Sequence, residues 1–178
     1  MKIATDIGAK RFVPFLRECR SRCFWYAGDK NQARASIEEA LTEVEALNAE
    51  AFIGAWVLGT CALLSETAVE AKDYLSRADL ILENGCVGHN YYRFYTQAID
   101  TTLRHGMYER TRHYITAFRE FLKDEPCPWS DFYLKRGDLL LTCYSSKIQD
   151  SEIVELIDTA KSLQLLSAIP MLENALVQ

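Results

Sequence analysis

Apolar residues recur at helical spacing along almost the whole chain, and this periodicity is the strongest constraint on its fold. In the segment 31–47 (NQARASIEEALTEVEAL) they follow the i, i+3, i+4, i+7 rule of one helix face, while most of the glutamates fall on the opposite side. The other periodic segments behave in the same way, and none shows the sustained alternation of a strand. The sequence therefore predicts an all-α protein.

Short breaks divide the periodic segments into pairs. Three of these breaks contain a glycine beside a polar residue, as is common where a helix ends: Gly28-Asp29, Asn84-Gly85 and His105-Gly106. Pro126 and Pro128 prevent the preceding helix from continuing and favour the start of the next one. We expect one domain over residues 1–178, with hairpins at roughly 9–48, 52–84, 90–124 and 128–164 and a terminal helix at 166–177.

Two helix starts carry side chains suited to capping. Thr67 is followed three residues later by Glu70, which is the spacing of a capping box. Asn90 follows the glycine at position 88, and its side-chain oxygen can accept an unpaired backbone N–H. We therefore expect Thr67 and Asn90 to be the N-caps of their own helices.

The pairs recur at an interval of about 38 to 40 residues, longer and less regular than the ~34-residue period of tetratricopeptide repeats. Small residues recur within them, and Gly59 falls where the two helices of one pair should approach closely. Each pair can bury its remaining apolar face only against a neighbouring pair. These features predict tetratricopeptide-like antiparallel helical hairpins stacked in a right-handed superhelix with a concave face. Arg17 and Ser21 depart from the repeat consensus, and another helical-hairpin array is the alternative.

Composition restricts the classes of partner and compartment. The net charge of −5 argues against a general affinity for nucleic acid or anionic membranes. No apolar run approaches the ~20 residues of a membrane span, and the first residues lack the apolar core of a secretory signal. Six cysteines lie within or near helical patterns, which favours reduced thiols in a cytoplasmic protein. The basic segment 104–123 is interpreted as a solvated helix face, with a docking surface for an acidic partner as the alternative.

A search for catalytic, cofactor-binding and metal-binding motifs assigns no residue to any of these roles. The segment 54–61 (GAWVLGTC) has glycines spaced as in a phosphate loop, but it lacks the lysine and lies in a helical pattern. Cys19 and Cys23 share a helix face, yet the histidines that would complete a zinc site lie two hairpins away. His89 and His113 have no nucleophile or orienting carboxylate nearby in the sequence, which disfavours an enzyme.

Partner or ligand contacts are the remaining candidates for function. The segment 86–95 (CVGHNYYRFY) is interpreted mainly as a loop and the start of a helix, but His89, Tyr92 and Arg93 could contact a ligand or a partner on the concave face. Arg112 and His113, on the following helix, are further candidates for a surface or groove contact. In the segment 125–140, Asp131, Lys135 and Arg136 are expected to form exposed ion pairs.

Two segments carry a family resemblance when they are taken together. The order GCVGHNYYRFYTQAID, then a helix with a glycine turn at Gly106, then EPCPWSDFYLKRGDLLL resembles the C-terminal helical-repeat region of large bacterial adenylate/guanylate cyclase-type proteins. The similarity covers about residues 8 to 141 and is densest between 85 and 137. Members of that family carry a class III cyclase domain, an ATPase module of the AAA type and then tetratricopeptide-like repeats.

The resemblance implies a repeat module that binds a protein or peptide partner, or regulates attached catalytic domains, in bacterial signal transduction. No catalytic residue is carried over, because the chain lacks the paired metal-binding aspartates of a cyclase and the lysine-bearing loop of the ATPase. The chain begins inside what looks like the second helix of an earlier hairpin, with Ile3 and Ile7 as its last apolar turn. We expect a non-catalytic interaction or regulatory module without a cofactor, and the alternative is a small-ligand sensor with a pocket near His89, Tyr92 and Arg93.

Overall fold

The computed structural model describes residues 3, 6–143 and 150–177, and over these residues it contains helices, turns and loops but no strand. The all-α prediction is confirmed. The chain divides into two compact units, Met1–Thr101 and Thr102–Gln178, each with its own packed helices. Over the described ranges, none of the helices combines the length and apolar character that a bilayer span requires.

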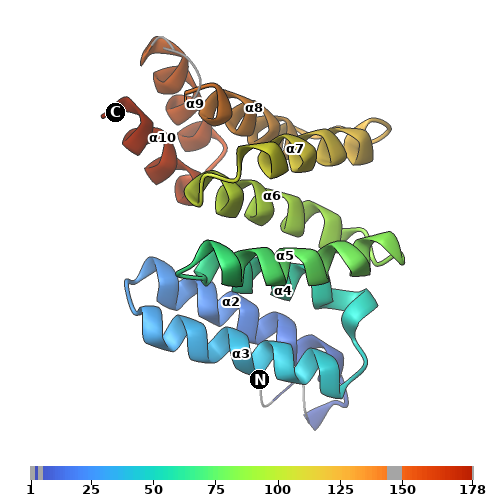
Figure 1. Ribbon diagram of the computed structural model, residues 1–178. Coiled ribbons are helices and arrows are strands. Elements are labelled where there is room, and N and C mark those ends of the chain that lie inside the picture. Colours follow the sequence, from blue (N-terminus) through green and yellow to red (C-terminus); the bar gives the residue numbers. More distant parts are fainter. Residues whose placement is uncertain (1–2, 4–5, 144–149, 178) are drawn as a thin grey trace. The chain divides into compact units, whose positions relative to one another are not determined.

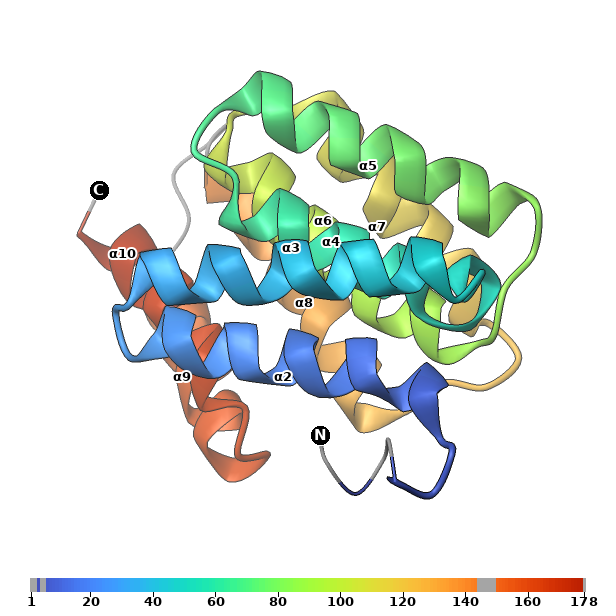
Figure 2. The ribbon, with the colours of Figure 1, turned by 90° about the horizontal axis from the view of Figure 1, so that it is seen from below.

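The first unit is made of two helical hairpins and most of a further helix. Figures 1 and 2 both show α2 and α3 side by side and running in opposite directions. The short turn η1 (Lys10–Phe12) precedes α2, and the π-helical turn η2 (Glu50–Gly54) leads into α4. The helices of this unit are α2 (Val13–Tyr26), α3 (Lys30–Ala46), α4 (Ala55–Leu64), α5 (Ala68–Glu83) and α6 (His89–Arg104), the last of which continues into the second unit.

The second unit is built around α8, which packs against the helices before and after it in sequence and against the last helix of the chain. Its elements are α7 (Tyr108–Leu122), α8 (Pro128–Cys143), α9 (Asp150–Ser162), η3 (Leu166–Ala168) and α10 (Ile169–Leu176). The helix boundaries agree with the expected segments to within a few residues. A single repeat domain over 1–178 and a tetratricopeptide-like superhelix stay predictions.

The core of the first unit is centred on α4. This helix is apolar on every side, and all its residues except Leu63 are buried. It lies against α2, α3 and α5, while α3 contributes the apolar face expected from the sequence, with Ala33, Ile37, Ala40 and Val44 at most 2% exposed. A helix enclosed in this way can be almost uniformly apolar, because hardly any of its surface meets water.

The capping prediction is confirmed at Thr67, whose side-chain oxygen accepts from the Glu70 backbone N–H at 3.2 Å. The return bond of the capping box is displaced by one residue. The Glu70 carboxylate accepts from the backbone N–H of Glu66, also at 3.2 Å, instead of from that of Thr67. Together the two bonds still satisfy backbone donors at the start of α5.

The prediction that Asn90 caps its own helix is wrong. Helix α6 already begins at His89, and the Asn90 side-chain oxygen accepts from the backbone N–H of Trp56 at 3.2 Å. The Asn90 amide nitrogen donates to the Phe52 carbonyl at 2.9 Å. Asn90 is fully buried and pairs backbone groups at the start of α4, so it caps a different helix from the one that carries it.

Gly59 is a packing residue, as expected, but its partner is not the one predicted. A Cβ at this position would collide with the side-chain oxygen of Gln97 and would approach Cδ2 of Phe94 to 3.3 Å. Both neighbours belong to α6, the first helix after the α4–α5 hairpin. The glycine therefore lets α4 approach the following pair and not the second helix of its own pair.

The two departures from the repeat consensus join α2 to α3 through polar contacts. Ser21 is fully buried, and its hydroxyl donates to the Ala33 carbonyl at 2.6 Å. Arg17 forms ion pairs with Glu39 and Glu43, the latter with 2.8 Å between Nε and Oε1. Polar side chains thus replace apolar packing at this helix contact.

Candidate functional site

The predicted contact residues His89 and Arg93 lie together in the first unit, on either side of Trp56. His89 Nε2 is 2.6 Å from the Phe52 carbonyl oxygen, and its ring meets the rings of Phe52 and Trp56 edge-on, with centroids 5.4 and 5.8 Å apart. The Arg93 guanidinium lies 5.1 Å from the centre of the Trp56 ring, in cation–π range. One turn of α6 separates the two residues, which brings them to the same face. Tyr92 is half-buried on the same helix, and its carbonyl accepts from the Thr96 hydroxyl at 3.3 Å.

Trp56 is the aromatic centre of this group and is 5% exposed. The Phe15 ring packs against it edge-on at a centroid distance of 5.0 Å. The indole Nε1 is buried and finds no hydrogen-bond acceptor among the described residues. A buried N–H without an acceptor is costly, so the favourable contribution of Trp56 comes from ring packing.

Three polar side chains connect α2, α4 and α6 beneath the Trp56 group. The Thr60 hydroxyl on α4 donates to Oε1 of Glu18 on α2 at 2.8 Å, and the Gln97 amide on α6 donates to the Thr60 oxygen at 2.7 Å. With its amide turned over, Gln97 instead donates to the carbonyls of Trp56 and Arg93 at 3.1 and 3.2 Å, and its oxygen accepts from Thr60. In the first orientation a continuous set of buried hydrogen bonds joins the three helices. In the second the single Thr60 proton goes to Gln97, so the bonds of Gln97 join α6 to α4 alone.

Glu18 is the charged residue among these three and is fully buried. Its Oε1 lies 2.7 Å from Nε of Arg22, one turn later on α2, while its Oε2 has no hydrogen-bond partner in the part of the chain that the structure describes. Burial works to lower the pKa of the Arg22 guanidinium, but the Glu18 carboxylate, together with Cys19 and Tyr26, raises it above its usual value. The sequence analysis missed this pair, for which the i, i+4 spacing of opposite charges was the available signal.

The remaining predicted contact residues, Arg112 and His113, are exposed on α7 in the second unit. Arg112 forms an ion pair with Glu109, and the His113 ring lies 5.5 Å from that of Tyr114. Two further cations of the basic segment are also paired: Arg119 with Asp138, at 2.7 Å, and Lys123 with Glu120. Neighbouring carboxylates thus offset much of the basic charge, which favours the solvated-face interpretation.

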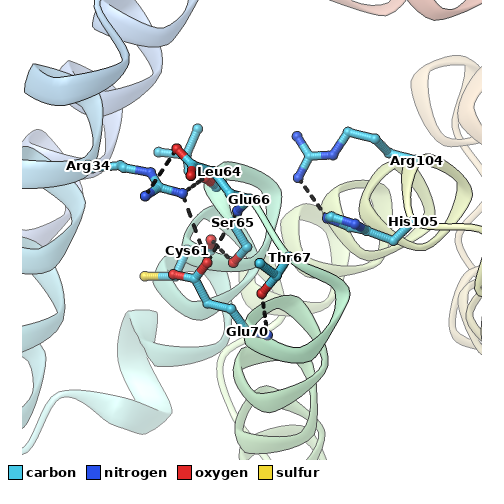
Figure 3. A network of polar contacts seen from close by, with 9 residues as sticks. All are labelled: Arg34, Cys61, Leu64, Ser65, Glu66, Thr67, Glu70, Arg104 and His105. Atoms are coloured by element: carbon cyan, nitrogen blue, oxygen red, sulfur yellow. Dashed lines mark hydrogen bonds and ion pairs between the residues drawn. The ribbon is translucent and has the colours of Figure 1, made fainter.

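Figure 3 shows a polar network around Arg34, which joins α3 to the turn between α4 and α5. The Arg34 guanidinium donates to the Leu64 carbonyl at 2.9 Å and lies 3.5 and 3.9 Å from the carboxylates of Glu66 and Glu70. A cavity of about 20 Å³ lies beside it, which is room for one water molecule. We assign this network a structural role. In the second unit, Arg104 Nη2 lies 3.2 Å from His105 Nε2.

The second unit contains a much larger hollow, the α8–α9 groove, with a volume of about 570 Å³. Its apolar part includes Phe132 and Leu139 on α8 and Leu156 on α9, with Leu163 just beyond the end of α9. Phe132 is 2% exposed and packs into the fold, whereas Leu163 is 39% exposed at the rim. The described residues that line it are Pro128, Asp131, Phe132, Lys135, Leu139, Glu152, Glu155, Leu156, Thr159, Ser162 and Leu163.

Four charged side chains of the described residues line this groove, and three of them are acidic. Asp131, Glu152 and Glu155 oppose a single cation, Lys135, and all four are exposed. Within residues 6–143 and 150–177, none of them forms an ion pair. The expected pairing of Asp131 with Lys135 is therefore not made, and both charges remain available to a partner.

The prediction that Arg136 forms an exposed ion pair is wrong. Arg136 is 1% exposed, and its Nε donates to the Ala168 carbonyl at 3.2 Å. Its guanidinium lies 5.7 Å from the centre of the Tyr133 ring. A buried arginine of α8 thus holds the turn that leads into α10, a role that local sequence spacing does not reveal.

All six cysteines are free thiols, and they differ strongly in accessibility. Burial raises the pKa of Cys61 to about 12, whereas Cys23 is exposed.

Because the thiolate is the reactive form, we expect iodoacetamide at pH 8 to modify Cys23 early and to leave Cys61 unmodified until the protein is unfolded in urea. Peptide mass spectrometry at timed intervals measures both. Equal rates at Cys23 and Cys61 in the folded protein would contradict the burial of α4.

No group of three or more His, Cys, Asp or Glu side chains that could hold a metal ion occurs in the described part of the chain. Comparison with family models, with curated proteins and with solved structures finds no match. A functional assignment therefore has to rest on the geometry of the two units and on the chemistry of the side chains that line their surfaces.

Proposed function

We propose that this chain is a non-catalytic protein-interaction or regulatory module that binds a peptide or a domain in a groove of a tetratricopeptide-like helical stack. This is the role implied by its resemblance to the C-terminal repeat region of cyclase-type signalling proteins. The observation that carries the proposal is the α8–α9 groove, which is large and combines apolar side chains with unpaired charges. Grooves of this character between helices are common sites of peptide recognition.

The surroundings of His89 and Arg93 favour this function over a small-ligand sensor. Both side chains already make contacts inside the first unit, His89 with the Phe52 carbonyl and Arg93 with the face of Trp56. A ligand held by these groups would have to replace those contacts and compensate for their loss. We therefore assign His89 and Arg93 to the packing of α6 on α4, while Tyr92 keeps its place as a candidate contact of the alternative sensor function.

A peptide-display selection tests the proposal. The whole chain is used as bait, and the selected peptides are then measured against two variants, Leu163→Glu and Leu166→Glu. Both leucines are exposed and lie close in sequence, but only Leu163 lines the groove. We expect selected peptides to lose roughly tenfold or more in affinity for Leu163→Glu, because a carboxylate replaces an apolar contact, and to bind Leu166→Glu as they bind the original protein.

Two outcomes would contradict the proposal. One is a selection that enriches no peptide, and the other is a set of peptides whose affinity is the same for both variants. Circular dichroism of each variant checks that its helices are intact before binding is compared. Peptides that respond to a substitution at Tyr92 but not to Leu163→Glu would instead favour the sensor site on α6.

A further inference from the structure

We infer that the partner segment of the α8–α9 groove is a basic amphipathic helix of about three turns. The inference rests on the proposed function, because it names the chemistry of the partner for the same groove. Three properties of the groove lead to it: the length of its walls, the arrangement of its apolar side chains and the sign of its unpaired charges.

The walls of the groove match the length of a short helix. Its lining extends from Pro128 to Leu139 along α8 and from Glu152 to Leu163 along α9. At 1.5 Å per residue, each wall is about 16 Å long, which corresponds to three helical turns. Half of a cylinder about 10 Å wide and about 16 Å long occupies roughly 600 Å³. The groove volume of about 570 Å³ is close to this value, so the groove has room for a volume of that size.

The apolar side chains of the groove recur at helical spacing on both walls. Phe132 and Leu139 are two turns apart on α8, and Leu156 and Leu163 are two turns apart on the α9 side. Two such rows side by side suit a partner with apolar residues at i, i+3 or i+4 and i+7 on one face. An extended peptide would instead direct alternate side chains away from the groove.

The charges of the groove select the sign of the partner's flanking residues. The α9 wall contributes Glu152 and Glu155, and α8 contributes Asp131 with Lys135, the only opposing cation among the described residues of the lining. Asp131 and Glu152 lie in first helical turns, where carboxylates stabilise their own helices, yet their charge still faces the groove. Lysine or arginine beside the apolar face of the partner would pair with this excess of carboxylates.

The test uses a synthetic fluorescein-labelled helix of about 14 residues with leucines at i, i+3, i+4 and i+7 and lysines on both flanks. Fluorescence anisotropy measures its binding to the whole chain. Two control peptides have the same length: one carries glutamates in place of the lysines, and the other keeps the composition but alternates leucine and lysine with period two. We expect the acidic control to bind at least tenfold more weakly and the period-two control to lose most of its binding.

A pair of protein variants tests the groove charges directly. The double substitution Glu152→Gln and Glu155→Gln should weaken binding of the lysine peptide roughly three- to tenfold, as expected for the loss of two exposed ion pairs. The matched control is Asp124→Asn with Glu125→Gln, which removes the same charge from exposed positions outside the groove lining and should leave the affinity unchanged. Raising the salt from about 0.05 to about 0.3 M should weaken binding to the original protein more than to the Glu152/Glu155 variant.

The results separate this inference from the proposed function. Equal affinity for the lysine and glutamate peptides, or equal effects of the two double variants, would overturn the basic helix as partner. If display selection still yields groove-dependent peptides of acidic or non-helical pattern, the interaction function stands and only the partner chemistry is wrong. If no peptide depends on Leu163, both are overturned.

Discussion

Replacing Trp56 by alanine is expected to destabilise the first unit by about 3–5 kcal/mol, the usual cost of truncating a large buried aromatic residue. Trp56 is 5% exposed, and its ring contacts Phe15, His89 and Arg93. The substitution would leave a cavity between α2, α4 and α6. Because domains are stable by only about 5–15 kcal/mol, much of the first unit could unfold at room temperature.

Urea denaturation in a Trp129→Phe background measures this effect. Trp25 then remains as the fluorescent reporter of the first unit, and circular dichroism follows the whole chain. The matched variant is Trp56→Phe, which keeps a ring and removes the buried indole N–H that finds no acceptor among the described residues. We expect it to cost less than about 1.5 kcal/mol. Similar losses for alanine and phenylalanine would show that the ring contacts do not stabilise the unit.

Replacing Glu18 by alanine is expected to cost about 3–5 kcal/mol, in the range measured when one partner of a buried ion pair is removed. Glu18 is fully buried, accepts from the Thr60 hydroxyl and is paired with Arg22. Alanine would leave the Arg22 charge, one quarter exposed, without its carboxylate and would leave Thr60 without this acceptor. The urea midpoint of the first unit measures the loss.

Glu39 provides the control for this substitution. It forms an ion pair with Arg17 between α3 and α2, but its side chain is 56% exposed. Exposed ion pairs contribute little, so Glu39→Ala should cost less than about 1 kcal/mol. If the two alanine variants unfolded at the same urea concentration, the burial of Glu18 would not contribute as described. Glu18→Gln should fall between them, because it keeps an acceptor for Thr60 but loses the charge.

The sequence predicted the helices well because their signals are local. The apolar spacing in 31–47 became the buried face of α3, and the Thr67 cap depends on a residue only three positions away. The turn glycines are another local signal. Gly28, Gly85 and Gly106 all have positive φ, a backbone conformation that an L-residue rarely adopts. Each of these features is decided by a few neighbouring residues.

Three of the errors concern residues whose partners lie far away in sequence. Asn90 bonds to Trp56 and Phe52, Gly59 meets Gln97, and Arg136 reaches Ala168. A local pattern shows that such residues are capable of capping, close packing or pairing, but not which helix will approach them. For Asn90 and Arg136 we therefore predicted partners close in sequence. In the structure both side chains bond to residues far away in sequence.

The candidate sites were predicted in part. His89 and Arg93 were predicted as contacts of one site, and both lie against the Trp56 ring, which comes from another helix. Their role as partner or ligand contacts stays a prediction. The α8–α9 groove was not foreseen. Its lining residues have the ordinary amphipathic pattern of packed helices, and the space between them depends on how far α8 and α9 separate, which no spacing rule reports.

The buried hydrogen bonds among Glu18, Thr60 and Gln97 also have an evolutionary consequence. When a buried carboxylate, hydroxyl and amide bond to one another, replacing one of them alone leaves a neighbouring group without its partner. Divergent descendants of this gene should therefore alter positions 18, 60 and 97 in concert, with position 22 losing its cation whenever position 18 loses its anion.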